Sequence, residues 1–187
     1  MGTYTQSLMD RETSDAGEAR RLGEHIIAWL VEEQIILHQV TDCCYGPGYP
    51  PGPHYMRACG GIAERSREAD YAGFLERSPN GMELSTSRNA FINGQGTFGP
   101  ARCPHCRIGQ DYDVFYNASD EWYKGGKGDV KCERCGRIAP VTAWDHDDVL
   151  LGTLGMQFWG WPELSPEFLR ELERRSGHRW THMFGKL

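Results

Sequence analysis

The sequence predicts an α+β fold: a mixed or antiparallel sheet with an N-terminal and a C-terminal helix and an inserted four-cysteine unit. Three observations lead to this prediction. A helix-then-strand pattern occurs at each end of the chain, a strand-like alternation follows Gly81, and two C-x-x-C pairs lie between about 100 and 140. Helices and strands segregated along a chain in this way are typical of α+β architecture.

The N-terminal helix is expected over residues 18–33. Apolar side chains recur there at steps of three and four residues, which places them on one face of a helix. These residues are Leu22, Ile26, Trp29 and Leu30. The next segment, 34–40, is rich in Ile, Leu and Val and predicts a buried strand.

The C-terminal helix has clear boundary signals. Ser165 is a suitable N-cap, Pro166 suits the first helical position, and Gly177 can adopt the left-handed conformation that ends a helix. The apolar, glycine-rich stretch 149–161 before it predicts a bent or bulged strand. Residues 178–184 alternate and predict a closing strand.

Two further strand pairs are expected in the middle of the chain. A turn over 78–81 and alternation over 82–87 predict a hairpin. Inside the four-cysteine unit, residues 111–116 and 129–131 can pair as strands across a glycine-rich turn at 124–128.

Four cysteines form the most specific motif of the chain. Cys103 and Cys106 make one C-x-x-C knuckle, and Cys132 and Cys135 make the other. Four thiolates at this spacing can surround one ion tetrahedrally, and soft sulfur ligands select zinc. A closed four-thiolate site has a structural role, so we expect structural zinc. A reducible thiol pair and an iron site are the alternatives.

This pattern resembles zinc ribbons over residues 100–140. Together with the segment 158–162 (Phe-Trp-Gly-Trp-Pro) and the ending 185–187 (Gly-Lys-Leu), it resembles an uncharacterised group of bacterial zinc-ribbon proteins. The resemblance implies metal binding and no particular reaction.

The expected organisation has three parts. Residues 1–17 are polar, small and acidic and predict a flexible arm. Residues 18–187 are expected to form a single α+β domain, because a length prior of about 150 residues per domain favours one domain. The zinc ribbon at 100–140 is an inserted subdomain of it.

A proline- and glycine-rich segment at 45–53 predicts a long loop that carries aromatic side chains. Exposed aromatic residues beside proline are common interface anchors. We therefore predict that Tyr45, Tyr49 and Tyr55 bind a partner. The alternative is a stiff surface crossing whose tyrosines pack against the protein.

The remaining cysteines offer an enzymatic alternative. Cys43, Cys44 or Cys59 with His54 could form a cysteine nucleophile and its base, as in a hydrolase or transferase with structural zinc. Free cysteine is more often a small buried apolar residue, and the H-E-x-x-H and G-x-S-x-G motifs are not present. We predict no catalytic residues.

Charge argues against nucleic acid as the partner. The chain has a formal net charge of -6. Between Gly99 and Ala143 there are seven Lys and Arg against six Asp and Glu, so the expected zinc ribbon is nearly neutral. A nucleic-acid-binding zinc ribbon, the remaining alternative, needs a basic face to neutralise phosphates.

Two weaker motifs, one glycine-rich and one acidic, favour a structural interpretation over a binding site. The segment 94–99 matches G-x-G-x-x-G, but Pro100 and the first knuckle follow it where a dinucleotide site needs a helix, so a flexible lead-in is expected. The segment 145–148 (Asp-His-Asp-Asp) is a candidate second metal site, and a solvated acidic turn is the preferred interpretation.

No stretch reaches the roughly 18 apolar residues of a membrane span, and the N-terminus carries acidic residues where a signal peptide needs an apolar core. The sequence therefore favours a cytoplasmic, non-catalytic, zinc-stabilised protein-binding module. A toxin-neutralising immunity protein or an adaptor fits this description.

Overall fold

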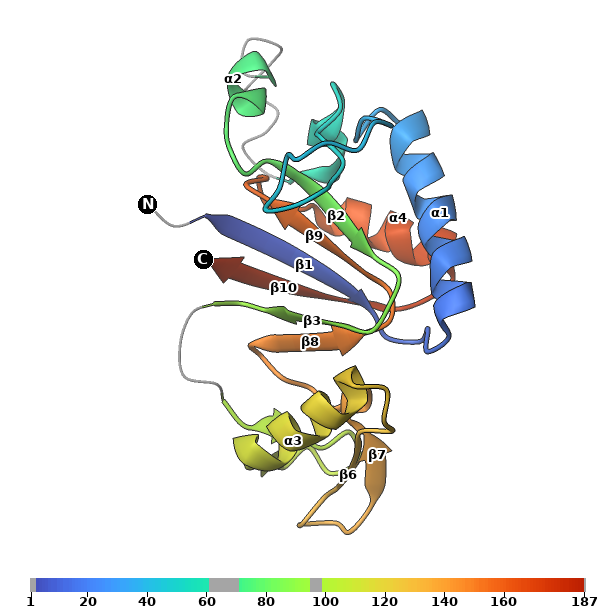
Figure 1. Ribbon diagram of the computed structural model, residues 1–187, viewed down its shortest axis with the longest axis vertical. Coiled ribbons are helices and arrows are strands. Elements are labelled where there is room, and N and C mark those ends of the chain that lie inside the picture. The colour runs from blue at the N-terminus through green and yellow to red at the C-terminus, as the bar shows by residue number, and fades with distance from the viewer. Residues whose placement is uncertain (1–2, 61–70, 95–98, 187) are drawn as a thin grey trace.

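The computed structural model describes residues 3–60, 71–94 and 99–186. It is a mixed α and β structure whose paired strands in the described part run antiparallel. Its elements form two units (Figure 1). The sheet unit holds a four-stranded sheet with two long helices, and the cysteine unit (residues 101–145) lies beyond one end of it.

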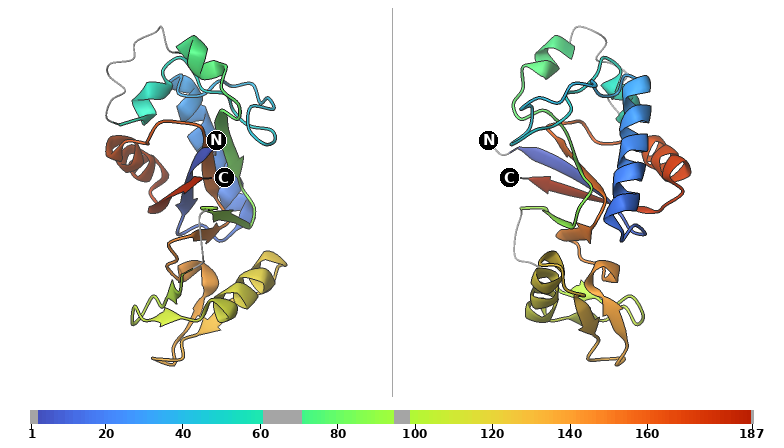
Figure 2. Two further views of the ribbon diagram at one scale, coloured as in Figure 1. Left: turned by 90° about the vertical axis from the view of Figure 1, so that its left-hand side faces the viewer. Right: turned by 45° about the vertical axis from the view of Figure 1, so that its right-hand side comes forward.

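The sheet has the strand order β10-β1-β9-β2. These strands are β1 (Tyr4–Asp10), β2 (Gly81–Ser85), β9 (Gly155–Trp159) and β10 (Trp180–Lys186). Helices α1 (Ala16–Glu32) and α4 (Pro166–Ser176) lie on the same side of the sheet (Figures 1 and 2). In chain order the sheet unit is thus β-α-β-β-α-β, the ferredoxin-like or split β-α-β arrangement.

Local signals explain where both helices begin and where α4 ends. Asp15 caps α1 by accepting a hydrogen bond from the backbone N–H of Glu18, and Ser165 caps α4 by accepting one from Phe168. Gly177 takes a left-handed φ of 73° after the last turn of α4. The roles predicted for Ser165 as the N-cap and for Gly177 as the left-handed end of α4 are thus confirmed.

The core of the sheet unit lies between the sheet and the two helices. Leu8, Met156 and Phe158 from the strands pack with Trp29 of α1 and Phe168 of α4. Because neighbouring residues of a strand point to opposite faces, the residues between these positions face away from the helices.

A bent hairpin connects the two units. β3 (Asn89–Ile92) and β8 (Val149–Gly152) pair with each other and continue the ladder of β2 with β9. Three residues separate β2 from β3 but only two separate β8 from β9, so the ladder is bulged and changes direction there. The predicted bend of 149–161 lies at this bulge.

The cysteine unit contains two short hairpins and a helix. Strand β4 (Ala101–Arg102) pairs with β5 (Gly109–Gln110), and β6 (Asp129–Lys131) pairs with β7 (Ile138–Pro140). Helix α3 (Tyr112–Tyr123) lies between the hairpins in the sequence.

Two short helical elements of the described part lie in the segment between α1 and β2. They are a 3-10 turn, Tyr55–Ala58, and the short helix α2 (Tyr71–Leu75). A second 3-10 turn, Val141–Ala143, follows β7. Isolated β-bridges hold the irregular chain between α1 and β2 in place, and one of them pairs Tyr49 with Met82 of β2.

Three sequence expectations differ from the structure. Residues 111–116 are not a strand but the start of α3, whose buried residues Phe115, Ala118 and Trp122 follow a helical spacing. Residues 34–40 form a turn and irregular chain with one bridge, Ile36 to Pro51, so the predicted strand is wrong. The alternating segment forms the strand β2, but the turn 78–81 does not close a hairpin, because helix α2 precedes that turn and β2 pairs with β9.

The expected flexible arm is a fourth difference, and this one changes the core of the sheet unit. Tyr4–Asp10 form β1, an interior strand of the sheet, and residues 1–2 of the arm lie outside the described part. The polar side chain of Gln6 is buried because the main chain of a distant segment satisfies it. Its amide donates to the Pro162 carbonyl at 2.7 Å and accepts from the Leu164 N–H at 2.8 Å.

Candidate metal centre

The first knuckle is a tight turn between β4 and β5. The N–H of Cys103 donates to the Ile108 carbonyl at 3.0 Å, and the N–H of Arg107 donates to the Cys103 carbonyl at 2.9 Å. Arg107 has a positive φ of 62°, which is uncommon for a residue other than glycine. The N–H of His105 points to the Cys103 sulfur at 3.4 Å.

The second knuckle repeats this pattern between β6 and β7. The N–H of Cys132 donates to the Arg137 carbonyl at 2.8 Å, and the N–H of Gly136 donates to the Cys132 carbonyl at 2.8 Å. Gly136 has a φ of 71° at the position equivalent to Arg107. Two turns of the same geometry therefore present their cysteine pairs to one another.

The four sulfur atoms lie within 4.8 Å of one another. The Cys103 and Cys135 sulfurs are 3.9 Å apart, and those of Cys106 and Cys132 are 3.7 Å apart. A zinc ion with Zn–S bonds of about 2.3 Å has its tetrahedral ligands about 3.8 Å apart. The sequence-predicted cysteines are thus brought together at a spacing that fits a tetrahedral ion.

The surroundings of the cluster favour a thiolate at Cys132 but not at Cys106. Cys103 and Cys132 are buried, and Cys135 is the most exposed of the four. The backbone N–H of Cys135 is the largest influence on Cys132 and lowers the pKa of its thiol to about 7. The backbone N–H of Ile108 lowers the pKa of Cys106, but burial and the neighbouring thiols outweigh it and raise that pKa to about 11. A thiolate, not a thiol, is the form that binds a metal ion.

The apolar core of the cysteine unit packs directly behind the sulfurs. Phe115 and Trp122 of α3 cluster with Val130, Cys103 and Cys132. This core is small, and the two hairpins that hold the cysteines contribute only two or three residues per strand. A small core of this kind commonly depends on a bound metal for its stability.

The acidic segment 145–148 does not assemble a second metal site. Asp145 pairs with Arg107 and Asp147 pairs with Arg102, while Asp148 accepts from Asn93. In the part of the chain that the structure describes, the four cysteines are the one group of three or more potential ligands close enough to share an ion.

Two of the three other cysteines, Cys44 and Cys59, have environments that disfavour a nucleophile. Burial raises the pKa of the Cys59 thiol to about 12. The pKa of the Cys44 thiol is also raised strongly, mainly by burial and to a smaller extent by the neighbouring Cys43 thiol. Cys59 points at the carbonyls of Tyr55 and Pro162. A reactive thiol needs a lowered pKa.

The three tyrosines predicted to bind a partner lie in different environments. Tyr45 is 68% exposed and its ring meets Trp159 edge-on at 4.8 Å. Tyr49 is half-buried and exchanges two backbone hydrogen bonds with Met82. The expectation of exposure is wrong for Tyr55, which begins a 3-10 turn and stacks on Phe74 in the core.

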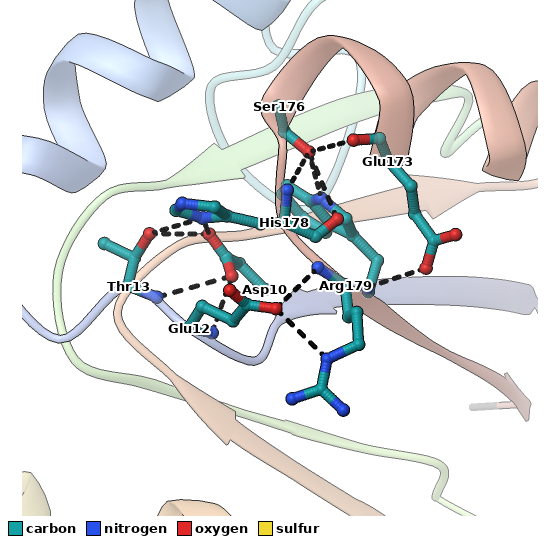
Figure 3. Close-up of polar contacts among 8 residues, drawn as sticks. Asp10, Glu12, Thr13, Glu173, Ser176, His178 and Arg179 are labelled. Carbon is teal, nitrogen blue, oxygen red and sulfur yellow. Dashed lines mark hydrogen bonds and ion pairs between the residues drawn. The ribbon is translucent and has the colours of Figure 1, made fainter.

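Sequence reasoning missed a buried polar network at the end of β1 (Figure 3). The Asp10 carboxylate is fully buried and accepts from Nδ1 of His178 at 2.8 Å and from the Thr13 hydroxyl at 2.6 Å. This hydrogen bond raises the pKa of His178 above its ordinary value. No local signal in the sequence points to it, because Asp10 and His178 lie 168 residues apart.

Residues 95–98 of the glycine-rich segment 94–99 lie outside the described residues. No helix in the described part is both long and apolar enough to cross a membrane. No protein-family model, curated protein or solved structure matches this chain.

Proposed function

We propose that this chain is a non-catalytic protein-binding module stabilised by structural zinc. The observation that supports the metal most strongly is the sulfur geometry, with distances of 3.7 and 3.9 Å across the two knuckles. Four protein ligands fill a tetrahedral zinc ion and leave no position for water or substrate. Zinc in such a centre stabilises the fold and performs no reaction.

The cysteine unit is proposed to be a zinc ribbon inserted at the tip of the bent hairpin. Its two knuckles sit on paired strands, β4 with β5 and β6 with β7, as in ribbons generally. Helix α3 between them is an addition that packs its apolar face on the knuckles.

A protein is a better partner for this unit than nucleic acid. Arg102, Arg107 and Lys124 are each paired with an aspartate. Paired cations neutralise fewer phosphates, and phosphate neutralisation supplies most of the affinity in non-specific nucleic-acid binding.

The partner surface is proposed to centre on Tyr45. Its ring is exposed yet held in place, because its edge-on contact with Trp159 and the hydroxyl contact with Thr3 at 3.4 Å limit its motion. A rigid, exposed aromatic side chain is well suited to anchor an interface. Tyr49 flanks it and is held by the β2 edge.

An acidic protein that neutralises a basic toxin, or an adaptor, is the role we propose for such a surface. The net charge of -6 would attract a basic partner. We also propose a cytoplasmic location, where thiols stay reduced and available to the metal.

Co-purification from native cells tests the partner proposal. Tyr45→Ala should lose a partner that the wild-type protein retains, and the folded state should stay intact. Tyr116→Ala is the matched control, since Tyr116 is 56% exposed on the distant helix α3. Equal retention by both variants would place the interface elsewhere.

A further inference from the structure

An open cavity of about 560 Å³ lies along the edge strand β2 and the residues that follow it, and it includes part of the face of the sheet that is turned away from α1 and α4. Met156 and Phe158 of β9 pack with the helices, so Trp159 lies on the opposite face. Glu83 of β2 shares that face, two pairs along the ladder and opposite Gln157. A volume of this size is typical of small-molecule sites.

Aromatic rings line this cavity from three segments. Trp159 comes from β9, Tyr45 from the loop before β2, and Phe91 from β3 beyond the bend. Phe91 crosses Gly155 so closely that a side chain at that glycine would collide with the ring. The cavity is therefore formed by the bend of the hairpin together with the Tyr45 loop.

Glu83 is the one charged residue among those that line the cavity. Within the described part of the chain it forms no ion pair with a lysine, arginine or histidine. Burial raises its pKa, and the two groups that counteract the rise are the neutral side chains of Trp159 and Cys44. A cation bound beside this half-buried carboxylate would favour its charged form and offset the remaining cost of its desolvation.

We infer that this cavity binds an organic ammonium ion, with Glu83 as its counter-ion and the rings of Tyr45 and Trp159 as its aromatic walls. Aromatic rings attract ammonium groups through their quadrupole, and a nearby carboxylate adds charge complementarity. An anion would find no positive side chain here. A divalent metal ion would find a single carboxylate, with neutral hydroxyl and amide oxygens as its other side-chain ligands, and one negative charge holds Ca²⁺ or Mg²⁺ weakly.

The ammonium group has two sources with the same chemistry. It is either a free amine or the lysine side chain of a protein partner, and the second source rests on the proposed function. Tyr45 belongs both to the proposed partner surface and to the wall of the cavity, whereas Glu83 belongs to the cavity alone.

Titration with choline, butylammonium and the peptide acetyl-Gly-Lys-Gly-amide tests the inference. The readout is the indole N–H signal of Trp159 in a ¹H–¹⁵N spectrum, assigned through Trp159→Phe. The neutral isostere of choline, 3,3-dimethylbutan-1-ol, should bind at least about tenfold more weakly than choline. Binding of the peptide alone identifies lysine as the source, and binding of the free amines identifies a small ligand.

Glu83→Gln keeps the shape of the side chain and removes its charge. It should weaken binding of the cation at least about tenfold while the protein melts at the same or a higher temperature, since an uncompensated charge has been removed. Glu121→Gln, an exposed position on α3, should change neither quantity.

The inference is wrong if none of the three cations shifts the Trp159 signal, if the neutral isostere binds equally well, or if Glu83→Gln binds as the wild type does. If the cation test fails in one of these ways while the protein still retains its partner, the inferred cation site is rejected and the proposed function stands. Loss of the partner with cation binding preserved would do the reverse.

Discussion

The Oδ2 atom of Asp10 accepts a hydrogen bond from Nδ1 of His178 at 2.8 Å, although 168 residues separate the two in the sequence. This contact joins the end of β1 to the turn between α4 and β10. The Asp10 side chain has no exposed surface, and His178 retains 20% of its own. The pair thus fixes an interior strand of the sheet to the last helix (Figure 3).

The first prediction concerns pH. The hydrogen bond to Asp10 raises the folded pKa of His178, so the protonated imidazole is stabilised in the folded state. The stabilisation is complete below the unfolded histidine pKa of about 6.5 and is lost as the pH rises through the folded value. Urea unfolding should therefore give the wild type an extra free energy of unfolding at pH 6 compared with pH 9. Asp10→Asn should remove this extra stability.

At pH 6 the cost of Asp10→Asn should be about 1 to 3 kcal/mol, because a buried acceptor of charged and neutral donors is lost. His178→Gln should show a similar loss of pH dependence. A wild-type protein and an Asp10→Asn variant with parallel pH profiles would contradict the assignment.

Local signals in the sequence were sufficient for the two cysteine knuckles and for α4. The C-x-x-C spacing forces each cysteine pair into one turn, and the Ser165 and Gly177 caps act through bonds within a few residues of themselves. Such features depend on short stretches of chain, and a sequence displays them directly. The meeting of the two knuckles also follows from ligand chemistry, since one ion needs all four sulfurs.

The interior strand β1 could not be predicted, because its polar residues have partners far along the chain. Gln6 is satisfied by Pro162 and Leu164, and Asp10 by His178. Composition alone assigns such residues to the surface. The cavity beside Glu83 was equally hidden, since a loop, an edge strand and a bent hairpin meet there only in the folded protein.

Removal of the metal is the second prediction. Chelation should unfold residues 101–145, because the small core of the cysteine unit depends on the ion, while the sheet unit has its own core. Hydrogen exchange should rise in α3 and β6 and stay low in β1 and β9. Uniform protection before and after chelation would show that the metal is dispensable.

Single cysteine variants sharpen this test. Elemental analysis should give one zinc per chain for the wild type, and Cys132→Ser should lose it, because three thiolates cannot close the tetrahedron. Cys59→Ser is the control, since Cys59 lies in the sheet unit against Tyr55 and Pro162 and should keep the metal. Zinc retained by Cys132→Ser would place the ion elsewhere.

The third prediction concerns the contact between the two units. Arg88, at the bend of the hairpin, donates to the carbonyls of Trp122 and Gly126 and lies over the Trp122 ring at 5.2 Å. The Trp122 carbonyl lies in the last turn of α3 and the Gly126 carbonyl follows the helix, where a cation is favourable. Arg88→Met should destabilise the cysteine unit by about 1 to 3 kcal/mol.

Hydrogen exchange, measured beside thermal unfolding, separates this effect from a general loss of stability, because it reports on the cysteine unit and the sheet unit separately. Arg20→Met on the exposed face of α1 is the control and should stay within about 0.5 kcal/mol of the wild type. Arg88→Lys should restore only part of the loss, because one ammonium cannot reproduce the planar fork of a guanidinium. Full stability in Arg88→Met would mean that the units do not depend on this contact.

The last prediction tests the core of the sheet unit. Phe168 of α4 is 4% exposed, stacks on Trp29 at 5.6 Å and meets Phe158 edge-on. It joins both helices to the sheet, so Phe168→Ala should cost about 3 to 5 kcal/mol through the cavity it leaves. Phe184→Ala is the matched control: that ring is 52% exposed on β10, and its removal should cost far less. Chemical denaturation of both variants measures the difference, and similar costs would mean that the ring of Phe168 does not hold the helices to the sheet.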